Sequence, residues 1–491
     1  MKTRGDSQYD LLPEVVDEPN NLSEEKAQSP KPIFVYPKEH ILTIPFIWDG
    51  YDTFFTMVFI FFGLFSRFWI IHQPQTYTQF EVKYLTSIHY YLNKTFFVSD
   101  QPPFQELLMG SFARKMEYES IFNINPDQNY TFHMPFYTNL RSISAFYSMM
   151  SIPILYLTLR CFGSKQFCSF CGGFFCLISQ TMIPTMRNID ISGAILFYTS
   201  ASLLFAGLSH HFIYGSPQQI LFVFLQGLFA SFSISSSFLT FPIVIFSMFW
   251  PLVRFNSKKQ ALINGLLSIL CLYLSCLLHF LYTPIIQGYQ ASKFGVSNFS
   301  QFHSSNNNYK SLEFNHLIYS CYYMNLLIFR FIKQSLCNLH FSSVFRKLLM
   351  LENWHVIWSQ NGRLITCFTN KLVTFPAALF AYYGLLSSFR NLKFDSRKCL
   401  SLLFVLFLLW NAFSYHPSNS GCYDSYLPEY FGIIIFILYI ENSFTPKDYG
   451  IVLTFLLIVC GLLFLDWVPV IYAYVNPNPF VQPGINIADY K

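Results

Sequence analysis

The sequence predicts an all-α protein that crosses a membrane many times. Of its 491 residues, 53% are hydrophobic and only 12% are charged, whereas a soluble domain carries about 25% charged residues. Several apolar runs have the roughly 17–25 residues that a helix needs to cross a bilayer. The runs at 402–410 and 431–439 also lack the polar face that a soluble helix shows about every 3.6 residues. These observations exclude a large soluble helical core.

The chain begins with a polar segment, residues 1–50, which we expect to be a disordered cytosolic tail. It is rich in acidic residues and prolines, and it holds no apolar core of a cleavable signal peptide. The first apolar stretch would then act as the signal anchor.

We expect about eleven membrane-spanning helices, each in one apolar stretch of suitable length. They lie near residues 54–71, 143–159, 167–183, 191–208, 220–234, 238–253, 262–282, 365–386, 400–413, 431–440 and 451–465. The fifth and sixth are read either as two short helices or as one bent segment. Spans 1–7 thus occupy residues 51–283 and include a luminal loop at 73–139. A second luminal loop covers 284–364, and spans 8–11 with the C-terminus cover 365–491.

Lys and Arg residues indicate the orientation, because they gather in the connections that face the cytosol. With a cytosolic N-terminus, the basic connections all lie on the cytosolic side and the C-terminus is luminal. Arg187 is the visible exception on the luminal side. Three Asn-x-Ser/Thr sequons, at Asn93, Asn129 and Asn298, also lie on the predicted luminal side.

Other functional classes find no support in the motifs. The sequence holds no phosphate-binding glycine loop, no His-Glu-x-x-His pair and no Gly-x-Ser-x-Gly elbow. Cys168 and Cys171 have the spacing of a metal or thiol-exchange pair, but cysteine inside a membrane span is more often a small apolar residue. The net charge of +5 is modest. We therefore predict neither a metal site nor a nucleic-acid partner.

The first luminal loop is too long for a plain connection and contains two amphipathic segments. In residues 81–92, Tyr84, Ile88 and Tyr91 fall on one helical face. Residues 104–116 show the same helical period. We expect both segments to form helices that lie in the plane of the membrane interface.

Glu81, the pair Pro102-Pro103 and Arg141 mark a site on this luminal side. A carboxylate can take a proton from a hydroxyl group, and the fork of an arginine matches phosphate oxygens. The three elements together indicate a glycosyltransferase that uses a lipid phosphate. Structural roles stay open: a solvated helix face for Glu81, a snorkelling helix end for Arg141, and a helix boundary for the prolines.

Two segments of this loop resemble motifs of the protein O-mannosyltransferases of the GT-C superfamily. They are residues 79–84, Gln-Phe-Glu-Val-Lys-Tyr, and residues 96–106, Phe-Phe-Val-Ser-Asp-Gln-Pro-Pro-Phe-Gln-Glu. Arg141 matches the arginine that opens the next span of the family. Weaker matches follow in order at Arg187–Ser192, at His340 and at Tyr426–Pro428. The resemblance spans most of residues 50–470, without the family's luminal sugar-binding-type repeats.

The resemblance implies a GT-C fold in the endoplasmic reticulum membrane and transfer of mannose from dolichyl phosphate mannose to Ser or Thr hydroxyl groups of proteins. It also implies membrane lipid as surroundings and a dimer with a related mannosyltransferase, and it leaves the need for a divalent metal open. The site residues that it implies are Glu81 and Asp100 as catalytic groups, Arg141 at the donor phosphate, Gln101, Pro102 and Pro103 in loop structure, and His340 and Tyr426 as acceptor or donor contacts.

The chain departs from the family pattern at several positions. Phe80 stands where the family has its catalytic Asp, Ser99 replaces a second Asp, Gln101 replaces His and Glu106 replaces Lys. A phenyl ring cannot take a proton, so another group, such as Asp100, would have to serve as base. Two alternatives follow: a non-catalytic paralogue that acts as partner subunit, or a lipid or solute transporter. A transporter would call for internal repeats, and the sequence shows no convincing one.

Overall fold

The computed structural model describes residues 48–74, 76–94, 97, 101–116, 134–283, 321–322, 325, 341–351, 355–360, 363–391, 395–413 and 425–472. All of them belong to one compact unit, His40–Lys491. The predicted disordered tail lies outside the described residues except for its last three positions.

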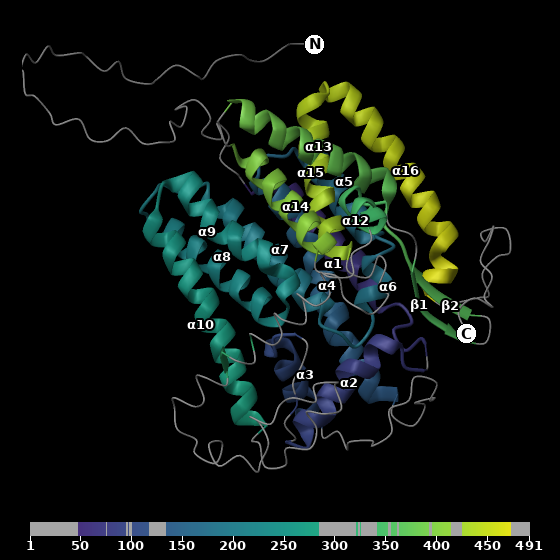
Figure 1. Ribbon diagram of the computed structural model, residues 1–491. Coiled ribbons are helices and arrows are strands. Elements are labelled where there is room, and N and C mark those ends of the chain that lie inside the picture. Colours follow the sequence, from purple (N-terminus) through teal and green to yellow (C-terminus); the bar gives the residue numbers. More distant parts are fainter. Residues whose placement is uncertain are drawn as a thin grey trace, which may run out of the picture. The chain divides into compact units, whose positions relative to one another are not determined.

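The described chain is helical apart from one two-stranded hairpin (Figure 1). Its first helices are α1 (Gly50–Phe68), α2 (Gln79–Leu92), α3 (Phe104–Lys115), α4 (Met134–Cys161), α5 (Gln166–Leu177), α6 (Met182–Met186) and α7 (Ser192–Ser209). Then follow α8 (Pro217–Ser236), the 3₁₀ turn η3 (Phe238–Thr240), α9 (Phe241–Phe255), α10 (Lys258–Tyr282), α12 (Phe341–Leu348), α13 (Lys371–Asn391), α14 (Ser396–Phe413), α15 (Tyr426–Ser443) and α16 (Pro446–Ile471). The strands are β1 (His355–Gln360) and β2 (Arg363–Cys367).

Seven helical segments of the described chain are long and apolar enough to cross a membrane. They are Gly50–Phe68, Phe136–Cys161, Ser192–Ser209, Pro217–Ser236, Phe238–Phe255, Lys258–Tyr282 and Pro446–Val468. Two shorter apolar helices are Gln166–Leu177 and Lys371–Ser387. The prediction of a multi-pass membrane protein is thus confirmed. Each of the eleven predicted stretches overlaps a helix, but crossing by all eleven stays a prediction.

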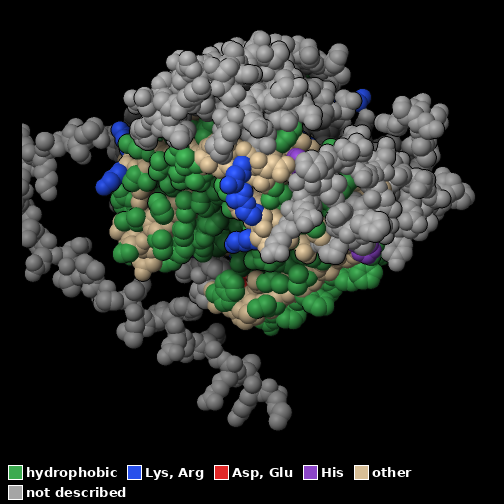
Figure 2. All heavy atoms as spheres, turned by 90° about the horizontal axis from the view of Figure 1, so that it is seen from below, with side chains coloured by type: hydrophobic (Ala, Val, Ile, Leu, Met, Phe, Trp, Pro, Cys, Tyr) green, Lys and Arg blue, Asp and Glu red, His purple; other side chains and the backbone are tan. Residues whose placement is uncertain are grey.

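The surface of these helices is itself apolar. Large hydrophobic side chains such as Phe61 on α1, Leu270 on α10 and Leu465 on α16 are more than half exposed. Figure 2 shows hydrophobic side chains over much of the described surface, with a strip of Lys and Arg side chains between them. In water such a surface would be costly, so these faces are suited to lipid.

The fifth and sixth predicted spans are two separate helices. Ser237, which follows α8, has an extended backbone, and its hydroxyl accepts a hydrogen bond from the Leu239 amide at 3.2 Å. This side-chain cap starts η3, and α9 follows directly. Serine at a helix boundary competes in this way for backbone groups, so the chain turns there and does not continue as one bent helix.

The eighth predicted span begins later than the sequence indicated. Residues 363–367 form β2, which pairs antiparallel with β1, and α13 starts only at Lys371. Val356, Trp358 and Ile365 are of the β-branched and aromatic types that favour strands. The expected helix start at residue 365 is therefore wrong, and the hairpin is the described exception to an all-α chain.

The two predicted amphipathic helices are present as α2 and α3. They pack against each other at one end of the helix bundle (Figure 1). Tyr84, Ile88 and Tyr91, the predicted apolar face, are all buried. The burial of this face confirms the amphipathic pattern read from the sequence.

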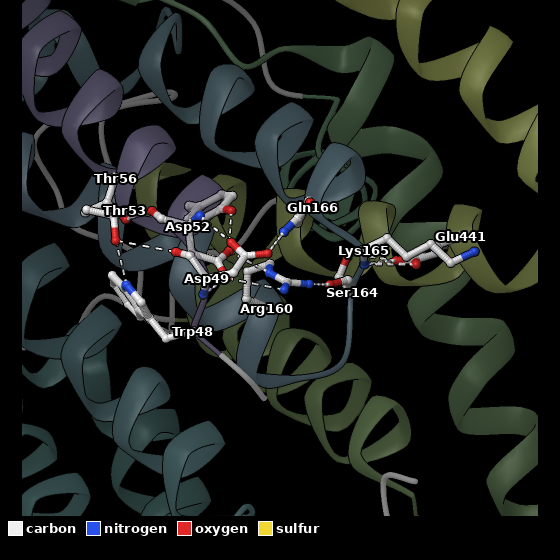
Figure 3. A network of polar contacts seen from close by, with 11 residues as sticks. Trp48, Asp49, Asp52, Thr53, Thr56, Arg160, Ser164, Lys165, Gln166 and Glu441 are labelled. Atoms are coloured by element: carbon white, nitrogen blue, oxygen red, sulfur yellow. Dashed lines mark hydrogen bonds and ion pairs between the residues drawn. The ribbon is translucent and has the colours of Figure 1, made fainter. Parts of the chain in front are cut away.

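A polar network ties helices together at the end of the bundle that is predicted to face the cytosol (Figure 3). Arg160 of α4 donates from Nε to the Asp52 carboxylate of α1 at 2.8 Å, and Tyr156 donates to the same carboxylate. The Ser164 hydroxyl donates to Glu441 of α15 at 2.7 Å. The network therefore fixes α1, α4 and α15 to one another at this end.

Helices α4 and α7 approach each other closely at Gly193, where a Cβ atom would lie 2.2 Å from the Ser144 carbonyl oxygen. We expect Gly193→Ala to lower the free energy of unfolding by about 1–3 kcal/mol, because the helices must move apart. Gly450→Ala is the matched control, since no atom lies within 4 Å of its added Cβ; we expect it to be neutral or to stabilise by roughly 1 kcal/mol. Unfolding in detergent measures both, and equal effects would contradict the close contact.

Candidate functional site

The first turn of α2 directs the Glu81 side chain toward the interior. Thr78 caps the helix: its hydroxyl accepts from the Glu81 amide at 3.2 Å, and the Glu81 carboxylate accepts from the Thr78 amide at 3.0 Å. This is the reciprocal capping box that the pattern Thr-x-x-Glu favours. The local sequence thus sets the position of the carboxylate before any tertiary contact forms.

Glu81 forms a buried bidentate ion pair with Arg141 of α4. Arg141 donates from Nε to Oε1 at 2.6 Å and from Nη2 to Oε2 at 2.9 Å. The two side chains are 1% exposed or less. A planar guanidinium opposite a carboxylate in this way is the strongest geometry that an ion pair adopts in proteins. The pair joins α2 to α4 across sixty residues of sequence.

The same two side chains also hold the neighbouring segments. Arg141 Nη1 donates to the carbonyl oxygens of Ile71 at 3.2 Å and Pro74 at 2.9 Å, in the connection between α1 and α2. Glu81 Oε1 accepts a further hydrogen bond from the Ile189 amide at 3.1 Å. Every nitrogen of Arg141 and both oxygens of Glu81 are thus engaged. This geometry favours an orienting role for Glu81, and the roles as base and as phosphate clamp stay predictions.

Residues 187–191 connect α6 to α7 and include Arg187, the basic exception among the predicted luminal connections. Asp190 accepts from the Ser192 amide at 3.0 Å, from the Ser192 hydroxyl at 2.9 Å and from the Ser144 hydroxyl at 3.2 Å. The Asp190 carboxylate thus lies against the Ser192 hydroxyl. The connection is therefore held on both sides, by Asp190 to α4 and by Ile189 to Glu81.

Arg67 is a second buried arginine that sequence reasoning missed. It lies near the end of α1, is 0% exposed, and donates to the carbonyl oxygens of Cys176 at 3.0 Å and Leu177 at 3.1 Å. These carbonyls end α5, where a cation is favourable to the helix dipole. A single arginine inside an apolar run gave no signal of this role, because the contacts come from a helix 109 residues away.

The Gln-Pro-Pro turn is held by contacts of its own. Gln101 Oε1 accepts from the Ser237 hydroxyl at 2.9 Å, and Gln105 Oε1 accepts from the Tyr198 hydroxyl at 3.1 Å. Pro103 is the residue that precedes α3 as its cap. The start of α3 is therefore bound to α7 and to the turn between α8 and α9. The sequence predicted the helix boundary but not these partners.

His279 of α10 fixes the segment that leads into this turn. Its Nδ1 accepts from the Tyr91 hydroxyl at 2.8 Å, and its Nε2 donates to the Phe97 carbonyl oxygen at 2.9 Å. Burial raises the pKa of Tyr91 well above its ordinary value, so the phenol keeps the proton that it donates. His279 thus positions Phe97, which lies four residues before Gln101.

The remaining predicted site residues are distributed as follows. Tyr426 is the first residue of α15 and is buried. Asp100 and His340 lie outside the described residues, and Phe80 is described only as part of the α2 backbone. In the described part of the chain, no group of three His, Cys, Asp or Glu side chains is placed to hold a metal ion. The structure therefore brings together Glu81 and Arg141 directly.

Removal of one partner from the buried ion pair tests how much the pair contributes to the stability of the fold. We expect Arg141→Met to lower the free energy of unfolding by about 3–5 kcal/mol, because Glu81 is left as an unpaired buried charge. The double variant Glu81→Gln with Arg141→Met should recover part of this loss. Arg397→Met, at a partly exposed arginine, serves as control. Unfolding in detergent measures all of these variants. If Arg141→Met were as stable as the double variant, the stabilising role of the ion pair would be contradicted.

Comparison with known proteins extends these observations. Residues 57–285 match the family model described as dolichyl-phosphate-mannose-protein mannosyltransferase. Among curated proteins, the chain is similar to dolichyl-phosphate-mannose--protein mannosyltransferase 5 of Saccharomyces cerevisiae, with 29% identity over 125 residues. That match covers 24% of this chain and 16% of the relative, so the chain spans only a small part of that protein's length in the alignment.

Solved structures provide the comparison of the fold. The chain is similar to the S. cerevisiae protein O-mannosyltransferase Pmt1-Pmt2 complex bound to the sugar donor, with a TM-score of 0.67 and 12% identity, over 90% of this chain and 92% of that chain. The Archaeoglobus fulgidus oligosaccharyltransferase AglB, in complex with an inhibitory peptide and a dolichol-phosphate, aligns with a TM-score of 0.44 and 13% identity, over 87% of this chain and 56% of that chain. The chain thus shares the fold of the solved protein O-mannosyltransferase complex, and its residues 57–285, a little less than half of its length, match the dolichyl-phosphate-mannose-protein mannosyltransferase family model.

Proposed function

We propose that this protein transfers mannose from dolichyl phosphate mannose to Ser or Thr hydroxyl groups of proteins, on the luminal side of the endoplasmic reticulum membrane. The observation that carries the proposal is the buried bidentate pair of Glu81 and Arg141 at the start of the first luminal loop. It stands within the segment that matches the family model. The solved relative of the same fold holds a sugar donor, which supports this choice of donor class.

The proposed reaction is one displacement at the anomeric carbon of mannose. The hydroxyl oxygen of the acceptor forms the new bond, the bond from carbon to the phosphate oxygen breaks, and dolichyl phosphate leaves. The hydroxyl proton passes to a base. Because the attack comes from the side opposite the leaving phosphate, the product has inverted configuration. The protein has to supply a base, a cation for the phosphate, and a fixed geometry between them.

Glu81 and Asp100 are the proposed carboxylates for this reaction. Both oxygens of Glu81 accept hydrogen bonds, so its proposed role is to orient the loop around Arg141. Asp100, which immediately precedes Gln101 in the sequence, is the proposed base in place of Phe80. Gln101 is bound to Ser237, which would fix the chain next to Asp100. His340 and Tyr426 are proposed contacts of acceptor or donor.

A second candidate function is that of a partner subunit without activity of its own. It is favoured by Phe80 and Gln101, which replace the catalytic Asp and the His of the family motif. The solved relative is a complex of two related chains. The retained Glu81–Arg141 pair would then serve the stability of the loop, and the partner would carry out the transfer.

Mannose transfer to a Ser/Thr peptide, measured with dolichyl phosphate mannose and purified protein, tests the proposal. We expect transfer by the wild type and a loss of at least about 100-fold in Asp100→Asn, since a general base contributes about 10²–10⁴-fold. Asp395→Asn, at an exposed aspartate on the predicted cytosolic side, is the matched control and should keep full activity.

The outcomes separate the two candidates. Activity only when a family member with the intact Asp motif is co-expressed would assign the partner role. Undiminished transfer in Asp100→Asn would reject that residue as base while the activity itself stands. No transfer in either setting would reject mannosyl transfer.

A further inference from the structure

Arg187, in the connection between α6 and α7, has unused hydrogen-bonding capacity in a buried position. The residue is 5% exposed. Its Nη2 donates to the Trp69 carbonyl oxygen, and its guanidinium carbon lies 4.5 Å from the centre of the Tyr472 ring. Its Nε is buried and has no hydrogen-bond partner among the described residues. A buried donor nitrogen without a partner normally lowers stability. A ligand that accepts a hydrogen bond from Nε would remove this cost.

The charges around Arg187 point to an acceptor that is an anion. Burial above all, with repulsion from Arg141 and Arg67, lowers the pKa of Arg187 to about 10. Arg141 is balanced by Glu81, whereas Arg67 is bound to carbonyl oxygens and carries its charge without an ion pair in the described chain. Arg187 likewise forms no ion pair with a described carboxylate. An uncompensated buried charge is unfavourable, and an entering anion would remove this cost.

The position of Arg187 is set by the ion pair already described. Glu81 accepts from the amide of Ile189, only two residues farther along the chain, and Asp190 is bound to Ser144. The Tyr472 ring that lies against the guanidinium is held by its own hydroxyl, which donates to the Ser66 carbonyl oxygen at 2.7 Å. Arg187 is therefore presented by a fixed backbone next to the loop that the proposed function assigns to the donor.

We propose that Arg187 binds the phosphate group of a polyisoprenyl phosphate, both in the sugar donor and in the lipid product. The identification of the lipid rests on the proposed function, whereas the anion site itself rests on the contacts of Arg187. Arg141 is less suited to this role because each of its nitrogens already donates to Glu81 or to a backbone carbonyl. The guanidinium of Arg187 offers Nε, and a phosphate oxygen is the acceptor that best matches an arginine fork.

Binding of dolichyl phosphate to the full chain in detergent tests this site without need of catalysis. We expect wild-type protein to bind dolichyl phosphate more tightly than dolichol, the uncharged alcohol. Arg187→Gln should weaken binding of dolichyl phosphate roughly 10- to 100-fold, as expected from the loss of a hydrogen bond to a charged group, and should leave dolichol binding unchanged. Arg187→Lys should keep part of the affinity, because it keeps the charge without the fork.

Two controls make the result decisive. Arg397→Gln, on the predicted cytosolic side, should bind dolichyl phosphate as the wild type does. Inorganic phosphate, tested by competition, separates a lipid-phosphate site from a general phosphate site: competition at concentrations comparable to those of dolichyl phosphate would assign the latter. If Arg187→Gln does not fold, the comparison of dolichyl phosphate with dolichol on wild type and on Arg187→Lys still decides the matter.

Failure of this inference and failure of the proposed function give different results. Equal binding of dolichyl phosphate and dolichol by the wild type, or equal binding by wild type and Arg187→Gln, would overturn the phosphate site even if mannose transfer occurs. Binding that depends on Arg187 in a protein that transfers no mannose would support the site and reject the reaction.

Discussion

The end of this molecule that is predicted to be luminal depends on one interaction, the ion pair between Glu81 and Arg141. An ion pair taken out of water is costly unless both partners are fully hydrogen-bonded. Here the capping turn of α2, two backbone carbonyls of the α1–α2 connection and the amide of Ile189 complete the bonding of both side chains. Three segments that are separate in sequence, residues 71–81, the start of α4 and the connection at Ile189, therefore meet at one pair of side chains.

This arrangement gives Glu81 and Arg141 a structural role that does not depend on an acidic residue at position 80. A side chain that only transfers a proton contributes to activity and not to stability. Removal of one member of a buried ion pair, in contrast, leaves the other charge unpaired in apolar surroundings, which is unfavourable. The ion pair of Glu81 and Arg141 thus has a structural role whichever residue stands at position 80.

Local features of the fold were readable from the sequence. The apolar face of 81–92 predicted α2 to within two residues at its start, and the apolar stretches located the long helices. The β hairpin was missed, because a strand of Ile and Leu directly before a span adds to the same apolar run. An apolar run of this kind can form a strand or the start of a helix. Pairing with another strand decides between them, and the run itself does not reveal that pairing.

The candidate site was only partly readable. The sequence related Glu81 to Arg141 by resemblance, but the bidentate geometry depends on how α4 lies beside α2. Arg187 did leave a signal, since it stood alone among short luminal connections that otherwise lack basic residues. Arg67 left none, because its partners are backbone carbonyls and any residue type could have supplied them.

The network around Asp52 has a consequence for how the bundle can move. Arg160 joins α4 to α1 through Asp52, and Glu441 joins α15 to the turn after α4, all at one end of the molecule. A carrier that moves a solute has to open toward each side of the membrane in turn. The contacts that hold α1, α4 and α15 together at one end therefore do not favour an alternating motion of that kind.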